Sequence, residues 1–141
     1  MKIELENVKP MDIERRSFEI ITEELGDTPL VPGTELIVKR CIHTSADFDY
    51  AKNLCFSQDA VSRAIEALKE GACIVTDTQM AKAGINKKAL ARYGGEVYCF
   101  MSDEDVAEKA RENGTTRATA SMDKAAALNK KLIFAIGNAP T

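Results

Sequence analysis

The stretch Cys73-Ile74-Val75-Thr76-Asp77 decides the fold, because it is typical of a short buried strand that ends at a carboxylate. Two further apolar runs of similar length follow at 96–100 and 131–136. Helical patterns separate the three runs, and such alternation favours right-handed crossovers and a parallel sheet. The sequence therefore predicts an α/β fold in which residues 73–76, 96–100 and 132–136 are neighbouring parallel strands, buried on both faces beneath helices.

The carboxyl ends of these strands are where such a sheet binds ligands. Polar residues follow all three ends, in Thr76-Asp77, Met101-Ser102 and 137–141. A carboxylate such as Asp77 often only caps the next helix, and the neutral Gln79 gives it no partner for acid–base chemistry. The groups expected to converge are hydroxyls, an amide and a guanidinium, which suit a polar anionic ligand: Thr76, Thr116, Arg117 and Asn138.

Several helices are predicted from caps and apolar spacing. Asp12 is expected to cap a helix that ends at Leu25 before Gly26, and Thr34 to cap one that ends at His43. A third helix is expected between Ser57 and Gly71, with Asp59 in its first turn, and two more over 103–113 and 117–129. The first three helices have these apolar faces: Phe18, Ile21 and Leu25; Ile37, Val38 and Cys41; Ala60, Val61, Ala64, Ile65 and Leu68.

His43 is the single histidine of the chain. An imidazole ordinarily titrates near neutrality, so it is the side chain best suited to exchange a proton at physiological pH. Helical spacing places Leu36, Lys39 and Arg40 on its face, which makes a basic stripe that ends in an imidazole. That stripe could form a binding site for a polyanion that needs a proton. Alternatively, His43 only caps its helix and the two cations form a solvated face.

Composition narrows the class of protein. The 141 residues are the usual size of one domain, and 45% apolar with 29% charged residues is an ordinary globular balance. The net charge of −3, without a run of one sign, argues against a nucleic-acid binder with a broad basic face. The chain contains neither an apolar run of membrane-spanning length nor a signal peptide. A cytoplasmic protein without a membrane partner is therefore expected.

Common cofactor and nucleophile motifs are missing from the sequence. The four cysteines form no C-x-x-C pair, so a zinc or iron–sulfur site has almost no support: Cys41, Cys55, Cys73 and Cys99. No G-x-G-x-x-G or P-loop occurs, so no sequence motif supports nucleotide binding. A nucleophilic pair of Cys41 with His43 fails on geometry, because residues two apart on a helix point to nearly opposite sides.

Several strings resemble the precorrin-8X methylmutase family, in order and over nearly the whole chain. They include Arg16-Ser17-Phe18, R-C-I-H at 40–43 and T-D-T-Q-M-A-K-A-G-I at 76–85. Thr116-Arg117 before an Ala-rich helix and A-I-G-N-A-P-T at 135–141 continue the match. The resemblance implies a three-layer, flavodoxin-like fold, a homodimer, and an isomerase of cobalamin biosynthesis without a cofactor of its own. Such an isomerase moves a methyl group from C11 to C12 of the tetrapyrrole, giving hydrogenobyrinate or its cobalt form.

The resemblance also implies roles for individual residues. His43 corresponds to the catalytic acid or base, and Arg16, Ser17 and Arg40 fall where the family contacts substrate. Arg117 and the turn Asn138-Ala139-Pro140 are implied as pocket walls, with Thr76 and Thr116 beside them. A non-catalytic corrinoid-binding or carrier module is the alternative, since a carrier needs these contacts but not the imidazole. The family's chain continues beyond Thr141, so this single α/β domain is expected to be a fragment or a reduced relative.

Overall fold

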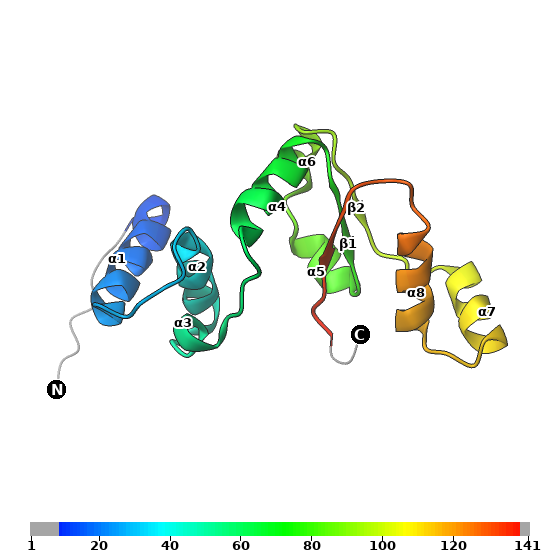
Figure 1. The fold of residues 1–141 in the computed structure, drawn as a ribbon, viewed down its shortest axis with the longest axis horizontal. Helices are drawn as coiled ribbons and strands as arrows, with labels where there is room; N and C mark the ends of the chain where they lie inside the picture. The colour runs from blue at the N-terminus through cyan, green and yellow to red at the C-terminus, as the bar shows by residue number, and fades with distance from the viewer. Residues whose placement is uncertain (1–8, 139–141) are drawn as a thin grey trace. The chain divides into compact units, whose positions relative to one another are not determined.

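The structure, a computed structural model, describes residues 9–138. Two compact units divide the chain, Met1–Val61 and Ser62–Thr141. In the part of the chain that the structure describes, the first unit is built of helices, and the second contains three strands with helices. Figure 1 shows the course of the chain through these elements. Among the described residues, no helix has the length and apolar character that crossing a membrane requires.

The first unit is helical. A short 3-10 turn (Pro10–Asp12) leads into α1 (Ile13–Leu25). Helix α1 packs beside α2 (Glu35–Ser45), and α3 (Tyr50–Asn53) follows α2 in the chain (Figure 1). The buried core between α1 and α2 consists of four apolar side chains: Ile21, Leu25, Val38 and Ile42.

The predicted core of α2 was partly wrong. Val38 is buried as expected, but Ile37 is 40% exposed and Cys41 is only half-buried. The second buried residue of α2 is Ile42, one turn after Val38, because positions i and i+4 share the face that meets α1. His43 follows Ile42 directly and therefore lies at the border of the packed face.

The predicted starts of the first two helices were correct in position, but the predicted side-chain caps were wrong. Asp12 and Thr34 occupy the N-cap positions of α1 and α2, but neither side chain accepts a capping hydrogen bond. Both have helical backbone angles, whereas a capping side chain requires an extended backbone. The Thr34 hydroxyl donates instead to the Val31 carbonyl, at 2.7 Å. Helix α2 also continues two residues past His43, until Ala46 adopts a left-handed conformation with φ of 56°.

The second unit contains the predicted parallel sheet. Strands β1 (Cys73–Thr76), β2 (Val97–Tyr98) and β3 (Leu132–Ala135) are arranged in the order β2-β1-β3, and both pairings are parallel. The expectation of strands buried on both faces was correct only for the central strand β1, where Val75 and Thr76 are inaccessible. Phe134 in the edge strand β3 is 47% exposed.

Five helices accompany this sheet. They are α4 (Ala60–Lys69), α5 (Gln79–Gly84), α6 (Lys87–Ala91), α7 (Glu104–Glu112) and α8 (Arg117–Ala126). Helices α7 and α8 lie side by side and bury Val106, Ala110 and Ala120 between them (Figure 1).

The prediction for α4 was wrong in two respects. None of its residues is buried, and Ile65 is 47% exposed, because no other part of the described chain covers its apolar stripe. Asp59 has a left-handed backbone with φ of 55° and precedes the helix, so it does not lie in the first turn.

Candidate active site

His43 is held by two side chains of α1. Its Nδ1 lies 2.8 Å from Ser17 Oγ, at hydrogen-bond distance, and the tautomer decides which atom donates. The Phe18 ring packs against the imidazole edge to face, with 5.8 Å between centroids and 68° between planes. Ser17 and Phe18 therefore fix the ring in position and orientation. Among residues 9–138, Nε2 of His43 has no hydrogen-bond partner, so it is the nitrogen left to act on a ligand.

Arg40 lies one turn before His43 on α2 and joins the same group. It donates from a terminal nitrogen to Glu14 Oε1 at 2.7 Å, and its Cζ lies 5.2 Å from the Phe18 ring centre. The hydrogen bond and charge of Arg40 hold the pKa of Glu14 below its usual 4.5, and Glu14 raises the pKa of Arg40 in turn. The pair is therefore intact above pH 4.5 and is lost only as the pH falls through the lowered pKa of Glu14.

A hollow of about 330 Å³ opens beside His43 within the first unit. Most of its lining is apolar and consists of Ile13, Ile20, Ile21, Ile42, Ala46 and Phe48. Four polar side chains complete the lining: Arg16, Ser17, Glu24 and His43. Arg16 at this rim also pairs with Glu19, at 3.4 Å. An apolar surface edged by an imidazole and a guanidinium suits a flat hydrophobic ring that carries carboxylates.

Asp77 organises the carboxyl end of the sheet in the second unit. It is 1% exposed, and its two oxygens accept hydrogen bonds from the backbone N–H groups of Gly137 and Asn138, both at 2.8 Å. The alternative that Asp77 only caps the next helix does not hold, because the Thr78 hydroxyl accepts from Ala81 N–H and caps α5. Asp77 thus ties the segment after β3 to the end of β1, and it places Asn138.

Two other predicted residues of this unit, Thr76 and Thr116, have structural partners. Thr76 is completely buried, and its hydroxyl donates to the carbonyls of Thr78 at 3.0 Å and Tyr98 at 3.3 Å. Thr116 caps α8, accepting from Thr119 N–H at 3.1 Å, and the exposed Arg117 is the first residue of that helix. Pro140 lies outside the described residues.

The capping role of Thr116 is testable apart from any ligand. Thr116→Ala is expected to lower the free energy of unfolding by about 1 kcal/mol, because it removes the acceptor for the Thr119 N–H. Thr116→Ser keeps the hydroxyl and should stay close to the parent. Urea unfolding followed by circular dichroism measures both variants, and equal stability of the alanine and serine variants would contradict the role.

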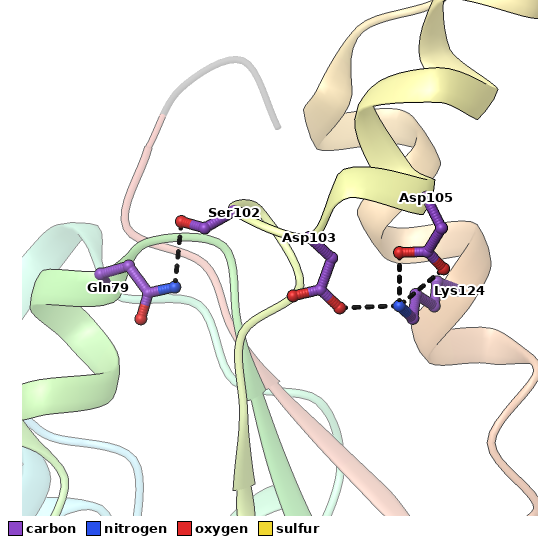
Figure 2. Close-up of polar contacts among 5 residues, drawn as sticks. All are labelled: Gln79, Ser102, Asp103, Asp105 and Lys124. Atoms are coloured by element: carbon purple, nitrogen blue, oxygen red, sulfur yellow. Dashed lines mark hydrogen bonds and ion pairs between the residues drawn. The ribbon is translucent and has the colours of Figure 1, made fainter.

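A second polar group lies beyond the ends of β1 and β2 (Figure 2). The Gln79 amide donates to Ser102 Oγ at 3.3 Å, and Lys124 of α8 pairs with Asp103 and Asp105, both at 2.7 Å. These hydrogen bonds raise the pKa of Lys124, and the bond from Lys124 lowers the pKa of Asp105. The group joins the start of α7 to α8, a contact that no local sequence signal indicated.

The structure brings the predicted site residues together in two sets. Arg16, Ser17 and His43 line one hollow, with Arg40 beside them, in the first unit. The second unit contains Thr76 and Asn138 around Asp77, and Thr116 and Arg117 at the start of α8. Within residues 9–138, no three His, Cys, Asp or Glu side chains are grouped as metal ligands would be.

Sequence reasoning missed Glu14 and gave Phe18 only a core role. The signal was present in the helical spacing of α1, because Glu14, Ser17, Phe18 and Ile21 recur at intervals that share one face. That face is not purely a core face, because its polar residues meet Arg40 and His43 of α2.

Comparisons with known proteins identify the family of this chain. The pattern of the CbiC family, described as precorrin-8X methylmutase, matches residues 12–141. The cobalt-precorrin-8 methylmutase of Priestia megaterium is 46% identical over 134 residues, which are 95% of this chain and 60% of that protein. The Salmonella typhimurium enzyme of the same name is 44% identical over 94% of this chain and 66% of its own length.

A solved structure is similar as well. The precorrin-8X methylmutase of Thermus thermophilus superposes with a TM-score of 0.79 at 36% identity, over 92% of this chain and 63% of that one. The chain thus spans about three fifths to two thirds of the length of these relatives. Because the family pattern covers nearly all of the sequence, the chain belongs to the precorrin-8X methylmutase family.

Proposed function

We propose that this chain supplies the His43 site of an isomerase of cobalamin biosynthesis, which moves a methyl group from C11 to C12 of precorrin-8X. The product is hydrogenobyrinate, or its cobalt counterpart. The observation that carries the proposal is the imidazole of His43, held at Nδ1 by Ser17 beside an apolar hollow. Because the relatives from Priestia megaterium and Salmonella typhimurium are named for cobalt-precorrin-8, the cobalt form is the first substrate to test.

The hollow and its rim fit the two kinds of surface on such a substrate. The apolar side chains of Ile13, Ile20 and Phe48 offer contact to the face of a tetrapyrrole ring. The guanidinium groups of Arg16 and Arg40 offer charge-assisted hydrogen bonds to its peripheral carboxylates. Holding the ring in one shape is itself catalytic, because a migrating methyl group needs its origin and destination aligned.

His43 supplies the proton. A methyl shift between neighbouring carbons breaks one carbon–carbon bond and forms another, without any net change in atoms. It is favoured by a proton placed to stabilise the rearranged electron distribution. Protonated His43 donates from Nε2, while its Nδ1–H donates to Ser17 Oγ. The bond to Ser17 persists while the proton is away from Nε2, so the ring keeps its orientation. The proton returns to Nε2 once the methyl group has moved, and the isomerisation leaves no net change in protons.

The second unit carries its own predicted substrate-binding residues. Arg117 is exposed at the start of α8 and can pair with a carboxylate, and Asn138 is exposed and set by Asp77. Thr116 and Pro140 stay predicted pocket residues beside them. Thr76 stays a prediction too, although its hydroxyl would have to leave the carbonyls of Thr78 and Tyr98 to reach a ligand.

Further features are proposed on the family resemblance. We expect a three-layer, flavodoxin-like arrangement, and the parallel β2-β1-β3 sheet with its helices supports it. We also expect one α/β domain, a homodimer, and a cytoplasmic protein that needs no cofactor of its own for the shift. Sedimentation at several concentrations would measure the dimer.

The proposed activity is tested by turnover. The chain, and in parallel a polypeptide extended to the full length of the relatives, is incubated with precorrin-8X or its cobalt form. Formation of hydrogenobyrinate or the cobalt counterpart is followed by visible absorption. The expected result is conversion with the longer polypeptide, and a spectral shift when the 141-residue chain is titrated with hydrogenobyrinic acid. Failure of the longer polypeptide to convert either substrate would overturn the proposal.

Arg40 gives a prediction about salt. Arg40→Ala is expected to weaken binding of hydrogenobyrinic acid about fivefold at low ionic strength and less at high ionic strength, because an exposed ion pair is screened. Leu36→Ala is the control, since Leu36 lies on the same side of α2 and is 72% exposed. Its effect should not depend on salt. An equal loss for Arg40→Ala at every ionic strength would show that Arg40 acts on the fold and not on the ligand.

A further inference from the structure

We infer that Glu14 is a positioning residue of the His43 site, which holds the guanidinium of Arg40 so that its free edge meets one carboxylate of the ligand beside the imidazole. The inference rests on the proposed function and adds a residue to it. Glu14 does not line the hollow, and it acts on the site through Arg40.

The geometry of Arg40 supports anchoring. A guanidinium has five N–H donors in a rigid fork, and the contact with Glu14 engages one terminal nitrogen through one oxygen. Among residues 9–138, the remaining donors of Arg40 have no hydrogen-bond partner. Glu14 therefore holds one side of the fork and leaves the other side able to accept a carboxylate in the paired geometry that arginine prefers.

Phe18 connects this anchor to His43. The same ring lies under the Arg40 guanidinium and against the imidazole, so both groups are fixed to one aromatic side chain of α1. The side chains of Arg40 and Glu14 are 54% and 56% exposed, and an unheld arginine in that setting would move among many rotamers. Holding it before the ligand arrives lowers the entropic cost of binding. It also fixes the distance between the bound carboxylate and the proton donor.

The sign of the effect separates this role from a plain charge effect. Glu14 is an anion near a site proposed for a polyanion, so charge alone predicts that removing it tightens binding. Positioning predicts the opposite. We expect Glu14→Ala to raise the dissociation constant for hydrogenobyrinic acid about two- to fivefold, the scale of an exposed ion pair. Asp12→Ala is the matched control, because Asp12 also forms an exposed ion pair, with Arg15 at 3.0 Å, and among residues 9–138 it bonds to neither Arg40 nor His43. It should leave binding unchanged or slightly tighter.

A double-mutant cycle decides whether Glu14 acts through Arg40. In the Arg40→Ala background, Glu14→Ala should cause no further loss of affinity, because its partner is already gone. Turnover of the polypeptide extended to the relatives' length gives a second readout, in which KM should rise more than kcat falls. The inference would be overturned if Glu14→Ala bound hydrogenobyrinic acid as tightly as the parent or more tightly. It would also be overturned if Glu14→Ala caused the same loss of affinity in the Arg40→Ala background as in the parent. If the parent itself does not turn over, the proposed function has failed instead, so the two failures are distinguishable.

Discussion

Replacing His43 with asparagine is expected to slow methyl migration by about 100- to 10,000-fold, the contribution of a positioned general acid. Asparagine keeps hydrogen-bonding capacity near Ser17 but cannot exchange a proton near neutral pH. Binding of hydrogenobyrinic acid should change little, because Arg16, Arg40 and the apolar lining remain. The measurement is a single-turnover assay with precorrin-8X or its cobalt form, on the polypeptide extended to the relatives' length.

The control for this variant is Ser17→Ala. It removes the partner at 2.8 Å from Nδ1 while keeping the imidazole, so it should slow turnover less than the loss of His43 does. A histidine that only caps its helix would behave differently. Its loss would lower the free energy of unfolding by about 1 kcal/mol or less and would leave the turnover rate unchanged. If His43→Asn turns over at the parent's rate, His43 has no part in the mechanism and a corrinoid carrier becomes the better description.

Replacing Asp77 with asparagine is expected to cost about 1.5–3 kcal/mol of unfolding free energy, the scale of one hydrogen bond to a charged group. The carboxylate is 1% exposed and accepts from two backbone N–H groups, Gly137 and Asn138. An asparagine can accept only one of them, and its NH₂ group then faces the other donor. Urea unfolding by circular dichroism gives the loss, and amide hydrogen exchange at residues 137 and 138 should rise most.

Asp47→Asn is the matched control for this prediction. Asp47 also accepts from a backbone N–H, that of Asp49 at 2.9 Å, but it is exposed. Water can replace that partner, so the variant should lose less than about 0.5 kcal/mol. If Asp77→Asn were as stable as Asp47→Asn, the link between the ends of β1 and β3 would have no energetic weight. Asn138 would then need another explanation for its position.

The sheet is the part of the fold that the sequence determined by itself. Short apolar runs separated by helical patterns leave few alternatives to parallel pairing, because each crossover must return the chain to the same end of the sheet. The prediction of parallel strands at 73–76 and 132–136 therefore matched β1 and β3 to within one residue. The extent of β2 was overestimated, since only Val97 and Tyr98 pair with β1.

Burial was less predictable, because it depends on what lies against an element. The apolar stripe of α4 has the right spacing for a core helix, yet none of its residues is buried in the described chain. In α2, periodicity alone allowed two apolar faces, and the contact with α1 selected Val38 and Ile42 over Ile37. Spacing shows that a face exists, whereas only the neighbouring element decides which face is covered.

The candidate site divides in the same way. The titratable imidazole and the family resemblance were enough to predict His43, Arg40 and Ser17 as site residues. Only the tertiary structure showed that Ser17 lies on His43 and that Glu14 holds Arg40, across 26 residues in each case. The same is true of Asp77, whose two partners follow it by 60 and 61 residues. Local sequence determines which way a side chain can face. The partner it meets there is decided by the packing of distant elements, since only that packing brings a donor within reach of an acceptor far away in the sequence.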